Sequence, residues 1–395
     1  MKRKLLFIAA ITSLTQTLFS QSLNFSGKLE TNYAAGIFNS NAGKCIQGGF
    51  ESEAKLEAFY NESSFNLLAA MEYNPVNAKN DEDFSFKIKE AYYDYNGSFW
   101  ALRAGRQINA WGAADGFILC DILCPQDITA LLADDTKESR LGIDALRLSL
   151  ISENINFDTY IIPFFTPAKL PEEIKKSVEI EKTETKISNF EYGGKLAFYL
   201  KKLDFSLYTF YGFQDEPLIA LQTSEPYLKG QYKKYYMLGF DSSIPAGDLT
   251  IRTESAVFPE KYFSRNDYAS SEKHTEIKTL AGLDWFKDNW QITGQYYADF
   301  ISSSVKNLDE KAFSHSASLQ IAYNIERLNL DLSATGLINF NDFDSYLSGE
   351  IKYDWTDAIN LSLQGKFFLK GYENEGTYGK YHDFSCIVLK GSYNF

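Results

Sequence analysis

Segments in which apolar and polar side chains alternate recur along almost the whole chain, and the last of them shows the constraint most clearly. In residues 384–395, one face carries mostly apolar side chains and the other carries Lys390, Ser392 and Asn394. A strand of this kind needs a partner for its edge and a cover for its apolar face. A closed transmembrane barrel meets both needs, because a neighbouring strand pairs with the edge and lipid covers the apolar face.

Eighteen such segments can be delimited, and the clearest pairs are joined by tight polar turns, as antiparallel hairpins are. We therefore expect an all-β fold, a transmembrane antiparallel barrel of about 18 strands. An even number places both chain ends on the periplasmic side, and one hairpin wrongly assigned would leave sixteen strands. The expected strands cover residues 23–37, 46–60, 64–74, 84–96, 98–106, 140–152, 155–164, 189–201, 203–213, 231–243, 248–258, 274–286, 289–301, 312–325, 327–339, 343–355, 358–371 and 380–395.

The first residues predict export from the cytoplasm. Three basic residues at 2–4 precede an apolar run over 5–19, which is too short to span a bilayer and has the layout of a secretory signal peptide. We expect a signal peptide over 1–20 and one barrel domain over 21–395, located in the bacterial outer membrane. No later run approaches the ~20 apolar residues of a membrane helix, and no linker divides the chain.

Composition agrees with a barrel and argues against other classes. Aromatic residues make up 16% of the chain, yet the mean hydropathy is -0.28, as expected where apolar and polar residues alternate. The net charge of -13 argues against a nucleic-acid partner. No blade-length repeat supports a propeller or a solenoid. The expected partners are outer-membrane lipid, the barrel assembly machinery and small polar solutes, and the sequence leaves open whether the barrel forms a homo-oligomer.

The longest connection, over 107–139, is the third extracellular loop in this topology, and it is too apolar for a surface loop. Long loops of compact domains are usually functional or disordered, and exposed apolar surface of this extent needs a cover. We expect the loop to fold into the barrel and narrow its lumen. The apolar residues of the loop are Trp111, Phe117, Ile118, Leu119, Ile122, Leu123, Ile128, Leu131 and Leu132.

Charged residues within and beside this loop are the candidates for a pore constriction. Two interpretations remain open: the bases and acids form ion pairs that fix the loop, or bases on one wall face acids across a gap and select solutes. Alternation turns Arg103 and Arg147 inward, together with Lys87 and Lys89. The candidates are Lys87, Lys89, Arg103, Arg106, Asp115, Asp121, Asp127, Asp134, Asp135, Arg140 and Arg147.

Candidates for chemistry are few. The histidines His274, His315 and His382 share no ligand spacing, and none has a serine two residues after it, which is the arrangement of outer-membrane phospholipases. We expect no enzyme, no metal and no cofactor. Export permits oxidation of cysteines, so a disulfide joining Cys120 to Cys124 or to Cys45 is a hypothesis.

Two stretches, 90–148 and 161–171, resemble the alginate-export-like barrels and their uncharacterised outer-membrane relatives. The shared marks are EAY at 90–92, GRQ at 105–107, WG at 111–112 and P-x-F-x-P at 163–167, together with Asp121, Pro125 and Asp127. The final aromatic residues, Tyr393 and Phe395, resemble the signal by which outer-membrane barrels are recognised for assembly. The resemblance implies an eighteen-stranded barrel with loops that line its lumen, acting as a passive porin or exporter.

The expected lumen departs from an arginine-rich polyanion pathway because it mixes both signs of charge. We therefore expect a porin-like channel for passive passage of small polar or charged solutes, narrowed by the 107–139 loop, and we do not carry over polyuronate transport. The alternative is an adhesin whose long loops bind a host ligand. The residues expected in the lumen include Lys28, Lys55, Lys195, Arg252, Lys366, Glu30, Glu53, Glu57, Glu72, Glu254, Asp284, Glu350 and Asp354.

Overall fold

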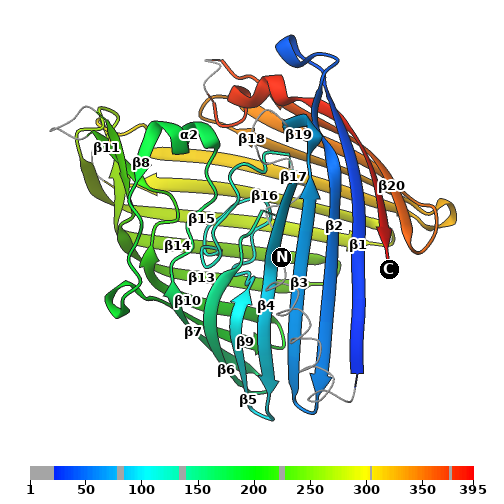
Figure 1. The fold of residues 1–395 in the computed structure, drawn as a ribbon, viewed down its shortest axis with the longest axis horizontal. Helices are drawn as coiled ribbons and strands as arrows, with labels where there is room; N and C mark the ends of the chain where they lie inside the picture. Colours follow the sequence, from blue (N-terminus) through cyan, green and yellow to red (C-terminus); the bar gives the residue numbers. More distant parts are fainter. Residues whose placement is uncertain (1–21, 78–83, 133–138, 222–226, 303–304, 373–375) are drawn as a thin grey trace, which may run out of the picture.

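Eighteen antiparallel strands form one closed sheet in the computed structural model (Figure 1), which confirms the expected barrel. The structure describes residues 22–77, 84–132, 139–221, 227–302, 305–372 and 376–395, so the expected signal peptide lies outside the described residues. The barrel strands are β1 (Ser22–Gly36), β2 (Cys45–Tyr60), β3 (Ser63–Tyr73), β4 (Phe84–Asn96), β5 (Trp100–Gln107), β6 (Ile143–Ile151), β7 (Ile155–Phe164), β9 (Glu191–Leu200), β10 (Leu203–Phe213), β13 (Lys234–Ala246), β14 (Leu249–Ser264), β15 (Ser271–Lys287), β16 (Trp290–Ile301), β17 (Phe313–Ile325), β18 (Leu330–Asn339), β19 (Asp344–Asp354), β20 (Ile359–Leu369) and β21 (Cys386–Asn394).

The first and last strands close the barrel. β1 pairs with β21 from Gly36 opposite Cys386 to Lys28 opposite Asn394. Beyond this ladder, Gly27 and Phe395 exchange two main-chain hydrogen bonds, with N to O distances of 2.9 and 3.0 Å. The Phe395 ring lies over Gly27, where a Cβ atom would clash with it, so this close approach requires glycine. Over this stretch, closure leaves neither terminal strand with an unpaired edge.

Alternation sorts the side chains of each strand between lipid and lumen. On β20 and β21, Leu361, Leu363 and Leu389 point outward and remain about half exposed, whereas Gln364 and Lys366 on β20 are almost fully buried inside. Aromatic pairs lie near the strand ends, as interface girdles require. The Trp290 and Tyr323 rings are in tilted contact near the short-turn end, with centroids 4.4 Å apart, and Tyr211 stacks on Tyr236 near the long-loop end.

Smaller elements lie in the connections between the barrel strands, most of them at the long-loop end, and the sequence pattern did not predict them. Strands β8, β11 and β12 form a separate three-stranded sheet, and helix α2 precedes it, at the upper left of Figure 1. Among the described helices, none is long and apolar enough to cross a membrane. These elements are β8 (Val178–Ile180), β11 (Leu218–Leu221), β12 (Leu228–Gln231), α2 (Glu172–Ser177) and the 3-10 turns η1 (Asn39–Asn41), η2 (Pro75–Asn77), η3 (Ile187–Asn189), η4 (Glu326–Leu328) and η5 (Gly379–Phe384).

Strand lengths differ from the expected ones on two walls. β14 extends to Ser264, six residues beyond the expected end at 258, because a bulge between Phe258 and Lys261 interrupts the alternation and hides the continuation in the sequence. The last strand begins at Cys386 instead of 380, because η5 occupies the preceding residues. The barrel therefore has a tall wall at β14 and β15, another at β1 and β2, and a low wall at β5, β6 and β7.

The assignment of faces can be tested on β17, where Leu319 points outward and its neighbour Gln320 lies on the lumen side. We expect Leu319→Arg to lower the free energy of unfolding by roughly 2–4 kcal/mol, because the charge would enter the middle of the lipid-facing band. Gln320→Arg is the matched control and should change stability little. Urea unfolding in lipid vesicles measures both variants, and equal effects would contradict the assigned register.

Candidate pore constriction

The third loop folds inside the barrel, as its apolar sequence predicted. Leu119, Cys120, Leu123 and Cys124 are at most 3% exposed. They belong to the largest buried cluster of the described residues, together with apolar side chains that β6, β7, β10, β13, β14 and β15 turn into the lumen. The wall residues of this cluster include Ile143, Ile162, Phe210, Met237, Ala256 and Leu280. The loop and the wall thus form one hydrophobic core inside the lumen.

Glu254 on β14 fastens the first half of the loop. Its carboxylate accepts hydrogen bonds from the main-chain N–H groups of Ala113, Ala114 and Cys120 at 2.6–2.8 Å. The side chain is 1% exposed, so these bonds replace the water that the carboxylate has lost. Tyr208 adds a fourth anchor, since its hydroxyl accepts a bond from Gly112 N–H at 3.2 Å.

Arg252, two residues before Glu254, holds the neighbouring part of the loop. Its guanidinium donates to the carbonyl of Ala113 at 2.5 Å and to the Asp115 carboxylate at 2.7 Å. It also pairs with Asp284 on β15 at 2.6 Å. Asp115, an expected pore residue, is therefore bound to the wall, which fits the ion-pair interpretation of this candidate.

Asp121 and Arg140 form an ion pair within the loop. Arg140 Nε donates to Asp121 Oδ2 at 2.8 Å, and the other oxygen of Asp121 accepts a bond from Trp111 N–H at 2.9 Å. The Asp121 and Arg140 side chains are only about one-tenth exposed. Asp121, in the middle of the loop, thus links Trp111 near its start to Arg140 near its end, so these candidates fix the loop and present little charge to the lumen.

The second half of the loop crosses to the opposite wall. The carbonyl of Leu132 accepts a hydrogen bond from Lys366 Nζ on β20. The Leu132 side chain packs against a small cluster of Ala34, Cys386 and Val388, at the seam where β1 meets β21. The loop thus spans the lumen from the β14 wall to the seam. The candidates Asp134 and Asp135 lie outside the described residues.

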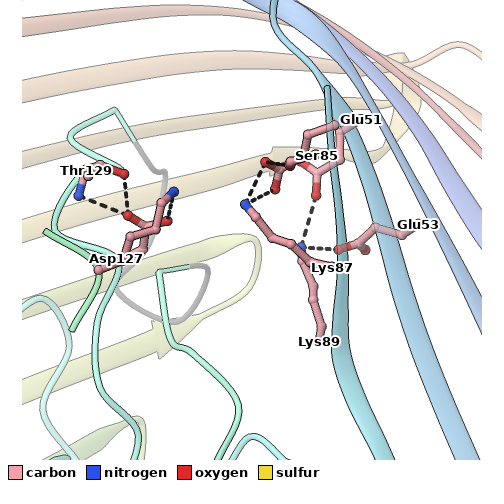
Figure 2. Close-up of polar contacts among 9 residues, drawn as sticks. Glu51, Glu53, Ser85, Lys87, Lys89, Asp127 and Thr129 are labelled. Atoms are coloured by element: carbon pink, nitrogen blue, oxygen red, sulfur yellow. Dashed lines mark hydrogen bonds and ion pairs between the residues drawn. The ribbon is translucent and has the colours of Figure 1, made fainter. Parts of the chain in front are cut away.

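Beside this crossing segment, two charged banks face each other across the lumen (Figure 2). On the β2–β4 wall, Lys87 pairs with Glu72 at 2.6 Å, and Lys89 lies between Glu51, at 3.0 Å, and Glu53. On the opposite bank, Lys169 pairs with Asp127 at 2.8 Å. Each bank therefore offers both an ammonium and a carboxylate to a passing solute.

Asp127 is held in its charged form on the loop side of this gap. Burial by itself would raise the pKa of its carboxyl group, but hydrogen bonds from Lys169 and from the hydroxyl and main-chain N–H of Thr129 lower the pKa below its ordinary value. A group that ordinarily ionises near pH 4 is therefore fully charged at neutral pH. The loop bank keeps its ion pair under physiological conditions.

The remaining arginine candidates divide between the two faces of the wall. Arg103 and Arg147 lie opposite each other on the lumen side of β5 and β6, paired with Asp94 at 2.8 Å and Asp158 at 3.0 Å. Arg106 falls on the outward side of β5 and pairs with Asp144 at 3.2 Å, which removes it from the pore. The sequence missed Lys169 because it lies in the following loop and carries no alternation pattern.

All four cysteines are free thiols, so the structure contradicts the disulfide hypothesis. Cys120 Sγ lies 3.4 Å from the carbonyl of Ser255 on β14, whereas Cys124 Sγ accepts a bond from Asn109 N–H at 3.2 Å, so the two side chains serve different contacts. Burial is the main cause that raises the pKa of both thiols, to about 12 for Cys124. Neither thiol forms the reactive thiolate at neutral pH.

The closed sheet of eighteen strands matches the fold of several solved structures. Acinetobacter baumannii OccAB3 matches with 12% identity over 95% of this chain and 99% of that chain, at a TM-score of 0.57. Pseudomonas aeruginosa OccK2 in complex with glucuronate matches with 9% identity over 95% of this chain and 99% of that chain, at a TM-score of 0.56. Pseudomonas aeruginosa OpdK with vanillate matches with 8% identity over 95% of this chain and 99% of that chain, at a TM-score of 0.59.

At these identities the likeness shows the fold. No family model matches the chain, and no curated protein matches it either. The resemblance to alginate-export-like barrels therefore stays a prediction from the sequence.

The anchor at Glu254 can be tested by removing it. We expect Glu254→Ala to leave three buried N–H groups of the loop without an acceptor and to lower the free energy of unfolding by about 1–3 kcal/mol. Limited proteolysis of the barrel in detergent should then cut within 108–142, where the parent protein resists. Glu57→Ala, which removes a lumen carboxylate that pairs with Lys55, is the control. Equal resistance of both variants would contradict the anchor.

Thiol accessibility follows from burial. In the folded barrel we expect a maleimide to label Cys45, which is partly exposed, and to spare Cys120, Cys124 and Cys386, which are buried. Unfolding in denaturant without a reducing agent should release all four thiols, and mass spectrometry counts them. Fewer than four labelled cysteines after unfolding would show a disulfide.

Proposed function

We propose that the protein is an outer-membrane porin-like channel for passive passage of small polar or charged solutes, narrowed by the 107–139 loop. The observation that carries the proposal is the loop itself, which is fastened to the β14 wall by Glu254 and reaches Lys366 on β20. A wide barrel with a fixed inner loop suits selective passage, because the loop reduces the lumen to a path lined by chosen side chains.

The charged side chains along this path favour small polar or charged solutes over polyanions. Lys87, Lys89 and Lys169 each lie against at least one carboxylate, so the local field of each base is largely compensated. A polyuronate needs a continuous row of uncompensated bases, and Lys87, Lys89 and Lys169 do not form such a row. The matched OccK2 and OpdK structures hold glucuronate and vanillate, which supports solutes of that size here.

We further infer export through a signal peptide over 1–20, assembly through the terminal residues Tyr393 and Phe395, and no enzymatic activity. In the structure Tyr393 and Phe395 stack with ring centroids 6.0 Å apart, and Phe395 also contacts Phe25 on β1. Aromatic groups at this height suit the interface between lipid and water.

Channel activity is tested by reconstituting the purified barrel in planar bilayers. We expect small, stable single-channel steps in the parent protein. Replacing residues 128–132 by a Gly-Ser linker should at least double the conductance, because it removes the side chains of the crossing segment, including Leu132, which packs against the opposite wall. A linker of equal length in place of the short turn 355–358 is the control. Unchanged conductance after the loop replacement would contradict a path narrowed by this loop.

The alternative, a host-ligand-binding adhesin, draws on the small sheet at the long-loop end. β8, β11 and β12 are hydrogen-bonded into a structure of their own, with β11 also contacting β14 through Ile219 and Ser264. Ordered loops on a rigid scaffold often bind partners. A barrel that carries no current, yet binds a host macromolecule through these strands, would favour this alternative.

A further inference from the structure

The outer surface of the low wall carries a charged pair on the face that a membrane barrel turns towards lipid. Arg106 on β5 and Asp144 on β6 lie directly opposite each other in the register, and both side chains point outward. The guanidinium donates two hydrogen bonds of 3.2 Å to the carboxylate. The Arg106 side chain is 35% exposed and that of Asp144 is 40% exposed, so the pair meets whatever surrounds the barrel.

The pair lies closer to the short turns than the thickness of a bilayer allows. Trp100 marks the short-turn interface on β5, where its ring contacts Tyr95 with centroids 4.8 Å apart. On the outward face, Leu102 and Ala104 alone separate Trp100 from Arg106. Six residues at about 3.3 Å each, tilted by about 40°, rise roughly 15 Å, whereas the apolar band of such barrels is about 25 Å tall. In a bilayer of that thickness the ion pair would lie within the hydrocarbon.

The tall wall shows the opposite arrangement. On β15 the outward face begins with Trp285 at the short-turn end, and its first charge is Lys273, twelve residues away. The same rise per residue gives roughly 30 Å over this distance, which is enough to cross the apolar band. The outward positions between them hold Leu283, Ile277 and smaller neutral side chains. The first outward charge of the low wall therefore comes at about half the height at which the tall wall has one.

Lipid is a poor cover for the low wall. A charged side chain that faces lipid within the apolar band destabilises a barrel. A wall shorter than the bilayer also makes the lipid thin or the protein associate. Association with a wall of the same height removes both costs, because protein then replaces lipid along the short strands. A phosphate headgroup fits the pair less well, since Asp144 compensates the charge of Arg106 and repels an anion.

We propose that the low wall is the contact surface of a twofold symmetric dimer of this chain, with Arg106 of each copy against Asp144 of the partner subunit. A twofold axis along the membrane normal, passing between β5 and β6, brings the two walls face to face and places each base opposite an acid. Ala91 and Ala104, the small outward neighbours of Arg106 on β4 and β5, leave room for a close approach. The contact concerns the outer surface, so it does not depend on the proposed channel function.

Cross-linking in lipid vesicles tests this surface, with Cys45→Ser as the background because Cys45 is partly exposed and the other three thiols are buried. In that background, Leu148→Cys places a thiol on the outward face of β6 beside the axis, and Leu319→Cys places one on β17 as the control. Each full-length barrel is reconstituted in a large excess of lipid and treated with a short bis-maleimide. We expect a covalent dimer from Leu148→Cys and none from Leu319→Cys. The yield should be higher in thick dieicosenoyl phosphatidylcholine bilayers than in thin dimyristoleoyl ones, because the mismatch is larger.

A double replacement separates a contact between copies from a structural role within one barrel. Arg106→Leu and Asp144→Leu are made together in the Leu148→Cys protein. We expect the dimer yield to fall about tenfold, the size expected for one lost charged hydrogen bond. Resistance to unfolding in urea should be kept, because apolar side chains in place of an ion pair suit the lipid.

The opposite results overturn the proposal. Equal cross-linking of Leu148→Cys and Leu319→Cys would show random collision, and no cross-linking of either would show a monomer whose ion pair meets lipid headgroups. A dimer that the double replacement leaves intact would rule out the ion pair as the contact, and equal yields in thin and thick bilayers would rule out wall height as the cause. The shift in gel mobility on boiling in SDS identifies folded barrels, and Leu146→Cys on the same face replaces Leu148→Cys if that variant fails to fold.

Discussion

The requirement that every main-chain polar group in lipid has a partner governs this structure. Hydrocarbon offers no water, so a sheet that spans it must close, and here β1 meets β21 to complete the ring. Closure has two consequences for function. It encloses one face of every barrel strand, and it produces a lumen wide enough to receive a loop of more than thirty residues, 108–142, between β5 and β6.

The loop covers apolar side chains on the inner wall of the barrel. Some inward positions of β6, β7, β13 and β15 are apolar, as at Ile143, Ile162, Met237 and Leu280, and would face water in an empty lumen. The loop covers them with its own apolar residues, and its polar main chain must then find partners inside the barrel. Glu254 and Arg252 meet that need. Narrowing of the lumen thus follows from burial and hydrogen bonding acting together.

The barrel strands could be predicted because apolar and polar residues alternate along them. The inward loop could be predicted because its residues are too apolar to face water. Other features leave no such mark. Glu254 and Lys366 form their hydrogen bonds with main-chain groups of the loop, which are the same at every position and leave no trace in the sequence. The bulge near Phe258 breaks the pattern that would reveal the tall wall, and the three-residue strand β8 is too short to show a period. Arg106 was a candidate because it flanks the loop in the sequence, but the alternation that turns Arg103 inward turns Arg106 outward.

Paired charges in the lumen imply selection at short range. An uncompensated row of bases would steer anions from a distance, but Lys87, Lys89 and Lys169 each lie against a carboxylate, and water and salt screen what remains beyond about 10 Å. A solute therefore responds to these groups only on contact, where it exchanges bonds to water for bonds to both ammonium and carboxylate. Under this constraint the geometry of polar groups on the solute matters more than its net charge.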